Sequence, residues 1–207
     1  MAKDKDKDKA KVKAKEKEKS KDKKKDKTKA KGKAKEHAQE SASKPQLTEW
    51  VAAGMDIGIV SDVHGQVPRA LYDIFADFDL LFFAGDAETV RCVWELGNIA
   101  PLVTVRGNCD YNIWRDCEMP EAINQEYEGV RFFMTHRPED VPRNLDPEVD
   151  VVIHGHTHVP RDQEINGVRW LNPGSATRPR GGSEPSCIAM HVEDGKITNL
   201  EFKTFKI

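Results

Sequence analysis

The chain has 207 residues, enough for one ordinary domain with an appendage, and its formal net charge is only -2. No stretch approaches the roughly 20 apolar residues of a membrane span. The charged N-terminal region lacks the apolar core of a secretory signal, and its many acids and scarce Ser and Arg are atypical of a mitochondrial transit peptide.

The charge is divided unevenly along the chain. Residues 1–44 contain 19 Lys and 9 acidic residues, a net charge of +10, whereas residues 45–207 contain 14 Lys or Arg and 26 acidic residues, a net charge of -12. Lys occupies nearly every odd position from Lys3 to Lys35 and leaves no apolar face for a helix or a strand, so we expect a disordered tail over 1–44 and a linker over 45–54. The tail is either a solubilising extension or an attachment to a polyanion, namely nucleic acid or an anionic membrane surface.

Short apolar runs begin at residue 55 and predict one domain over 55–207. Five runs, rich in branched or aromatic residues and followed by Asp, His, Asn or Gly, predict buried strands at 57–60, 80–84, 102–105, 130–134 and 151–153. An apolar stripe with helical spacing from Leu71 to Phe78 predicts a helix between the first two strands, and a second helix is expected around Val90–Trp94. This alternation predicts a mixed or parallel sheet covered by helices.

The C-terminal part has a different pattern. Strands are predicted at 168–171, 187–192 and 197–205, with a hairpin turn at Glu193-Asp194-Gly195 between the last two. Because no helical segment separates these strands, we expect them to form an additional antiparallel sheet.

Seven polar residues follow the predicted strands at the edge where ligands bind in open α/β sheets. Each alone has a structural explanation, as a helix cap, a left-handed turn residue or a buried histidine. Together they indicate a two-metal centre, in which a carboxylate after a central strand bridges the ions. Their nitrogen and oxygen ligands suit manganese, zinc, iron or nickel. The seven residues are Asp62, His64, Asp86, Asn108, His136, His156 and His158.

Six short motifs occur in an order that is typical of one family. They are Ser61-Asp62-Val63-His64-Gly65, Gly85-Asp86, Gly107-Asn108-Cys109-Asp110, Thr135-His136, Gly155-His156-Thr157-His158 and Asn172-Pro173-Gly174-Ser175. With them, the sequence from residue 55 onward resembles the calcineurin-like metallophosphoesterase superfamily, in its small YfcE-type phosphodiesterase branch. The resemblance implies an α/β fold, the four-layer αββα sandwich of two mixed β-sheets flanked by helices.

The resemblance also implies a metal-dependent phosphoric ester hydrolase, specifically a phosphodiesterase. Two divalent ions, with manganese expected first and zinc, iron or nickel as alternatives, would hold a bridging hydroxide that attacks phosphorus in line. One ion would take Asp62, His64 and His158, and the other Asn108, His136 and His156, with Asp86 bridging them. The final Asn172-Pro173-Gly174-Ser175 turn would support the histidine loop.

The resemblance leaves the proton donor for the leaving group open. Many members carry His after the Asn equivalent to Asn108, whereas this chain has Cys109, which is common in the small branch. Cys109 is either a thiol donor or a small side chain packed beside the metals, and Asp110 or water are alternatives. Arg137 stands where the family usually has Gly and is either a phosphate clamp or a solvated loop residue.

Two other functions are considered. The same branch includes the retromer subunit of vacuolar sorting, which uses this fold as a non-catalytic protein-interaction scaffold but departs from the ligand set. All seven ligand positions are filled in this chain, which favours an enzyme acting on a small phosphate ester. The basic tail suggests a further alternative, a nucleic-acid-directed phosphoesterase.

Overall fold

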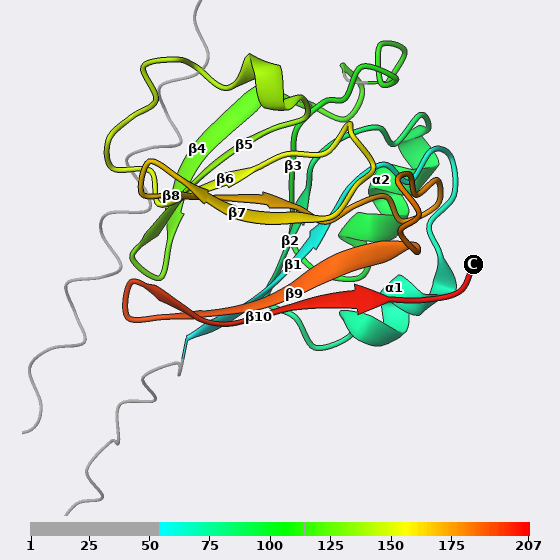
Figure 1. Cartoon of the computed structure of the whole chain (residues 1–207). Coiled ribbons are helices and arrows are strands. Elements are labelled where there is room, and N and C mark those ends of the chain that lie inside the picture. Colours follow the sequence, from blue (N-terminus) through cyan, green and yellow to red (C-terminus); the bar gives the residue numbers. More distant parts are fainter. Residues whose placement is uncertain (1–53, 114) are drawn as a thin grey trace, which may run out of the picture. The chain divides into compact units, whose positions relative to one another are not determined.

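The computed structural model describes residues 54–113 and 115–207, so the predicted tail over 1–44 and nearly all of the linker lie outside the described residues. The described part contains two five-stranded sheets, two α-helices and one 3-10 helix. Figure 1 shows the arrangement. In chain order the elements are β1 Met55–Val60, α1 Arg69–Ile74, β2 Leu80–Phe83, α2 Val90–Gly97, β3 Leu102–Thr104, β4 Ala122–Tyr127, β5 Val130–Thr135, η1 Pro138–Asp140, β6 Val151–Ile153, β7 Arg161–Ile165, β8 Val168–Asn172, β9 Ser186–Glu193 and β10 Lys196–Thr204.

Both sheets are mixed, as predicted. The first sheet has the order β10-β9-β1-β2-β3, in which β1, β2 and β3 are parallel and β9 runs antiparallel to both β1 and β10. The second sheet has the order β4-β5-β6-β8-β7, with β5, β6 and β8 parallel and the two edge strands antiparallel to their neighbours. Parallel strands bring their carboxyl ends to one edge of a sheet, where the predicted polar residues follow.

The core is built by the alternation of side chains along the central strands. Ile57 and Ile59 of β1 belong to an apolar cluster shared by the two sheets, whereas Val60 belongs to the cluster on the other face of the first sheet. Helices α1 and α2 cover that other face with Leu71 and Leu96, which are fully buried (Figure 1). The outer face of the second sheet is covered by the segment around η1, so its helical layer is reduced to a single turn.

Three predictions about elements need correction. Strands β9 and β10 extend the first sheet, and β8 pairs in parallel with β6, so the C-terminal strands form no separate antiparallel sheet. Strands β4 and β7 were not predicted, because both are edge strands with mostly exposed polar residues. Helix α1 ends at Ile74, and Phe75 and Phe78 continue the apolar stripe beyond it.

The helices in the described part of the chain are too short and too polar to span a membrane.

Candidate metal centre

The first group of candidate ligands comes from the ends of β1 and β6. His158 Nε2 lies 3.0 Å from Asp62 Oδ1, and His64 Nε2 lies 3.8 Å from the same oxygen. The two histidine nitrogens are 3.1 Å apart. Asp62 and His158 are buried, so the group offers two imidazoles and one carboxylate with little access for bulk water.

The second group comes from the ends of β2, β3 and β5. His136 Nε2 lies 3.3 Å from Asp86 Oδ2 and 3.1 Å from Asn108 Oδ1. Asp86 also joins the two groups, since one ligand atom from each of Asp62, Asp86 and His136 lies within 4.8 Å of the others. A carboxylate between two sets of ligands is the arrangement that a bridging role requires.

His156 stands at the margin of this site. Its ring packs edge-on against the His136 ring with centroids 5.3 Å apart, and its backbone N–H donates to Asp62 Oδ2 at 3.1 Å. Within the described chain, no group of three mutually close ligand atoms from His, Cys, Asp or Glu includes a ring nitrogen of His156. Its ring is half-buried, and burial together with the nearby His136 lowers the pKa of His156. A neutral His156 ring retains a nitrogen lone pair that is available to bind a metal ion.

Hydrogen bonds fix the orientation of three of the histidine rings. Nδ1 of His64 lies 2.7 Å from Glu88 Oε1, and Nδ1 of His136 lies 2.7 Å from the carbonyl oxygen of Ala84. Nδ1 of His158 lies 2.5 Å from the carbonyl oxygen of Arg178. Because these acceptors place a proton on each Nδ1, the Nε2 atom of each ring faces the site, as in metal-binding histidines.

Two features of the site fit a divalent cation. Asp62 Oδ1 is buried and has no hydrogen-bond partner, a costly state for a carboxylate oxygen unless a positive charge lies beside it. The Nε2 atoms of His64 and His158 lie 3.1 Å apart, close enough for one cation to bind both. The residues present therefore fit metal binding.

The titration behaviour of the second group also favours positive charge at the site. Burial opposes the charged form of Asp86, but its contacts with His136 and with the N–H of Cys109 outweigh burial and lower its pKa to about 2. Burial likewise opposes charge on His136, yet the Asp86 carboxylate raises the pKa of His136 above its usual value. Asp86 is thus ionised and attracts whatever cation is present.

Backbone strain is concentrated among the candidate ligands. Five of the seven have a positive φ, a region that residues other than glycine rarely adopt and that costs about 1–3 kcal/mol for each residue. Such strain typically marks a site where function fixes the direction of side chains. The five are Asp62 (56°), His64 (43°), Asp86 (63°), His156 (66°) and His158 (59°).

Two glycines of the predicted motifs allow the loops to approach one another. A Cβ atom on Gly155 would lie 1.9 Å from Ser61 Oγ and 2.7 Å from Asp62 Oδ2, and a Cβ atom on Gly107 would lie 2.0 Å from Asp86 Oδ1. Any side chain at either position would therefore collide with the candidate ligands or their support.

The predicted turn at residues 172–175 contacts the histidine loop. The Asn172 side-chain amide donates to the carbonyl oxygen of Gly155 at 2.8 Å and to Thr157 Oγ1 at 3.0 Å. Ser175 Oγ donates to the carbonyl oxygen of Asp62 at 2.7 Å. The turn thus connects the β6 loop with the β1 loop.

Asp110 is fully buried beneath the second group. Its Oδ2 accepts the backbone N–H of Asp86 at 2.8 Å and of Gly107 at 2.7 Å, and its Oδ1 accepts the N–H of Glu88 at 2.8 Å. Both oxygens are therefore engaged in holding the loops, an arrangement that favours a positioning role over proton donation.

The structure places Cys109 beside the carboxylate of Asp86. Its backbone N–H donates to Asp86 Oδ1 at 2.8 Å, and its sulfur accepts a hydrogen bond from the Asn108 amide at 3.3 Å. Burial and the Asp86 charge raise the pKa of the Cys109 thiol to about 12.

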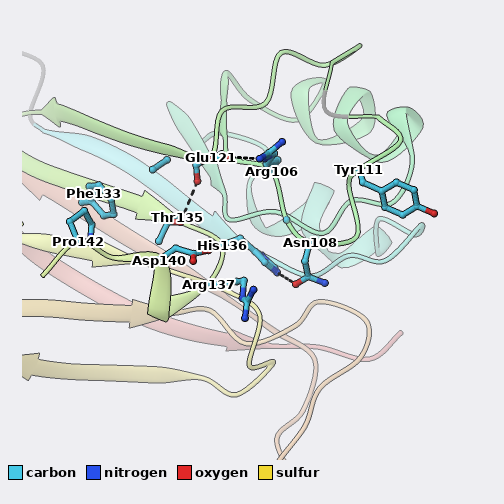
Figure 2. Close-up of a pocket in the computed structure, with 12 residues that line it drawn as sticks. Arg106, Asn108, Tyr111, Glu121, Phe133, Thr135, His136, Arg137, Asp140 and Pro142 are labelled. Atoms are coloured by element: carbon cyan, nitrogen blue, oxygen red, sulfur yellow. Dashed lines mark hydrogen bonds and ion pairs between the residues drawn. The ribbon is translucent and has the colours of Figure 1, made fainter.

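Arg137 follows His136 and lines a cavity of about 720 Å³ that adjoins Asn108 and His136. Figure 2 shows this cavity with Arg137 on one side of His136 and Arg106 on the other. The Arg137 guanidinium pairs with Glu139, with Nε 2.8 Å from Oε1. Arg137 is thus near the site but engaged with a carboxylate of its own loop.

Three residues at the site, Glu88, Arg178 and Tyr111, were not predicted from the sequence. Glu88 holds His64 and is contacted by Arg178, whose Nη1 lies 3.4 Å from Glu88 Oε1. In the sequence, Glu88 is distinguished only as an acidic residue two positions after Asp86. Tyr111 lines the cavity, although no spacing or motif distinguishes it from an ordinary loop residue.

Comparisons with known proteins show the family of the chain. The sequence profile of the calcineurin-like phosphoesterase superfamily domain matches residues 55–195. A probable metallophosphoesterase from Methanothermobacter thermautotrophicus is 35% identical over 159 residues, which cover 69% of this chain and 89% of the relative. The phosphodiesterase YfcE from Escherichia coli is 27% identical over 157 residues, covering 64% of this chain and 85% of the relative.

Solved structures show the same fold. A structure described as a novel archaeal phosphodiesterase is 26% identical with a TM-score of 0.60, covering 73% of this chain and all 100% of the other. The structure of E. coli YfcE is 25% identical with a TM-score of 0.56, covering 71% and 98%. Vacuolar protein sorting 29 from Cryptosporidium parvum is similar in fold alone, at 23% identity and a TM-score of 0.59, covering 74% and 99%.

Proposed function

Because the chain belongs to the calcineurin-like phosphoesterase superfamily, we propose that it is a metal-dependent phosphoric ester hydrolase, specifically a phosphodiesterase that acts by in-line displacement at phosphorus. The observation that carries this proposal is the group of ligand atoms around the unpartnered Asp62 Oδ1. Its Oδ1 is buried without a hydrogen-bond partner, and Nε2 of His64 and of His158 lie within 4 Å of it.

The proposed cofactor is a pair of divalent ions, with manganese preferred. One ion would be held by Asp62, His64 and His158. The second would be held by Asn108, His136 and His156, with Asp86 shared between the ions. The close approach of the ligand atoms within each of the groups around Asp62 and Asp86 supports this assignment, and their nitrogen and oxygen donors suit manganese as well as zinc, iron or nickel.

The chain's own residues would bind and orient the phosphate ester. When bound, the ions would activate water and offset the charge on the phosphoryl oxygens. The Asn108 amide donates to the weakly accepting Cys109 sulfur, a hydrogen bond that a phosphoryl oxygen would replace with a stronger one. Arg137 would reach a phosphoryl oxygen by turning from Glu139, with which it now pairs. Because Asp110 uses both oxygens to hold backbone, we expect esters with good leaving groups to be hydrolysed fastest.

Hydrolysis of bis(4-nitrophenyl) phosphate by the full chain with Mn²⁺ tests the proposal. We expect Asp86→Ala to lower the rate at least about 100-fold, because the variant lacks the carboxylate shared by both ligand groups. The control is Asp162→Ala, which removes an acidic residue of β7 that pairs with Arg169. Equal, background-level hydrolysis by the wild type and Asp86→Ala would contradict the proposed enzymatic activity. It would favour the alternative, a non-catalytic protein-interaction scaffold.

We further propose a role for the charged tail. The division into a tail over 1–44, a linker over 45–54 and a domain over 55–207 rests on composition, and the tail's charge of +10 suits contact with a polyanion, either nucleic acid or an anionic membrane surface.

We also propose that the protein functions in a reducing compartment such as the cytoplasm. The chain's four cysteines are all free, which supports this location.

A further inference from the structure

The cavity beside the second ligand group has the size of a small-molecule site. Its volume of about 720 Å³ falls within the range of about 300–1,000 Å³ that is common for ligand pockets. Asn108 and His136 line it, and Phe133 and Pro142 contribute apolar surface. Figure 2 shows Asn108 and Tyr111 toward one end of the group, and Phe133 and Pro142 toward the other. A phosphate at Asn108 would therefore leave space in the cavity for an attached group, with Tyr111 at the same end.

Tyr111 offers a flat apolar surface at this cavity. Tyr111 is 74% exposed, the most exposed of the large hydrophobic residues in the described part of the chain, so packing of the core does not account for it. The preceding residue, Asp110, is fully buried and bonded to three backbone N–H groups, which fixes the chain from which Tyr111 projects. An exposed aromatic ring on an anchored loop is a suitable platform for stacking.

Both arginines at the cavity are paired, and Asp140 adds a further carboxylate to its lining. Arg106 pairs with Glu121, and Arg137 pairs with Glu139, so each guanidinium already has a carboxylate partner. Figure 2 shows Arg106 and Arg137 on opposite sides of Thr135 and His136. A site with paired arginines, the Thr135 hydroxyl group and aromatic surface favours an uncharged group with polar edges over a second phosphate.

We propose that this cavity binds the organic substituent of the phosphate ester, that this substituent contains a planar ring with polar edges, as a nucleoside does, and that Tyr111 selects it by stacking. The inference rests on the proposed function, because it places the phosphate beside Asn108 and His136. It makes Tyr111 a specificity-determining residue, distinct from the residues that hold the metal ions.

Calorimetric titration of the Mn²⁺-loaded full chain with AMP and with ribose 5-phosphate tests this inference, since AMP carries a planar base where ribose 5-phosphate carries its anomeric hydroxyl group. We expect AMP to bind about 10-fold more tightly, as base stacking on an aromatic side chain predicts. Tyr111→Ala should abolish the difference, and Tyr111→Phe should retain it. Ala122→Trp should also abolish it by filling the cavity from the exposed start of β4, where an aromatic residue is compatible with a strand.

Equal affinities of the wild type for AMP and ribose 5-phosphate would overturn the inference, as would an equal loss of affinity for both in Tyr111→Ala. The outcome is separable from that of the proposed function. Hydrolysis of bis(4-nitrophenyl) phosphate that depends on Asp86, combined with equal affinities, would refute the ring site alone. A ring preference that depends on Tyr111 in a protein without hydrolytic activity would refute the proposed catalysis and leave the ring site in place.

Discussion

At the scale of single residues, Glu88 shows how support for the site extends beyond the predicted ligands. Its carboxylate lies 2.7 Å from His64 Nδ1, and Arg178 approaches the same oxygen at 3.4 Å. Its own backbone has a φ of 64° and donates to Asp110. A carboxylate on the far nitrogen of a metal-binding histidine fixes the ring and increases the basicity of its free nitrogen.

Removal of Glu88 should therefore weaken metal binding without removing a ligand. We expect Glu88→Ala to lower the affinity for Mn²⁺ about 10-fold to 100-fold, and Glu88→Gln to have a smaller effect because its amide oxygen still accepts from Nδ1. Isothermal titration calorimetry measures both, with Glu164→Ala on β7 as the control for loss of an exposed acid. An unchanged affinity in Glu88→Ala would show that His64 needs no carboxylate partner.

At the scale of elements, strands with two buried faces are predictable and edge strands are not. The runs that form β1, β2, β5 and β6 are almost continuously apolar, and the polar residues that follow them led to the candidate site. Strand β4 has mostly exposed residues, so it carries no such signal. The partners of β9 depend on tertiary packing, which local sequence does not specify, and the same holds for contacts such as that between Glu88 and His64.

The loop after β6 provides a test at this scale. Gly155→Ala would place a methyl group 1.9 Å from Ser61 Oγ, so the loop after β6 must move away from the loop after β1. We expect a loss of about 1–3 kcal/mol in the free energy of unfolding by urea, together with weaker Mn²⁺ binding, because Asp62 and His158 separate. Gly97→Ala in α2 is the matched control, since its Cβ would meet no atom within 4 Å. If Gly155→Ala were as stable as Gly97→Ala, the result would contradict the close packing of the two loops.

At the scale of the whole molecule, the small net charge conceals two oppositely charged regions. Residues 45–207 carry -12, and two bound divalent ions would reduce this to about -8, so the domain remains unsuited to binding nucleic acid without help. The net charge of +10 over residues 1–44 instead favours binding to nucleic acid or another polyanion. Because salt screens exposed charges strongly, attraction between the tail and a polyanion should depend on ionic strength in a way that binding at the metal centre does not.

The full chain with the tail lysines replaced by glutamine tests this separation. We expect the wild type to bind single-stranded DNA or anionic vesicles at 50 mM salt and to lose most of that affinity by 200 mM, as counterion release predicts, and the glutamine variant to show no measurable binding. A variant with residues 1–44 in scrambled order should bind like the wild type, since only charge is required. Hydrolysis of bis(4-nitrophenyl) phosphate should be the same in all three, because its small monoanion needs only the domain. Polyanion binding that survives loss of the lysines would instead assign it to the acidic domain and refute an electrostatic role for the tail.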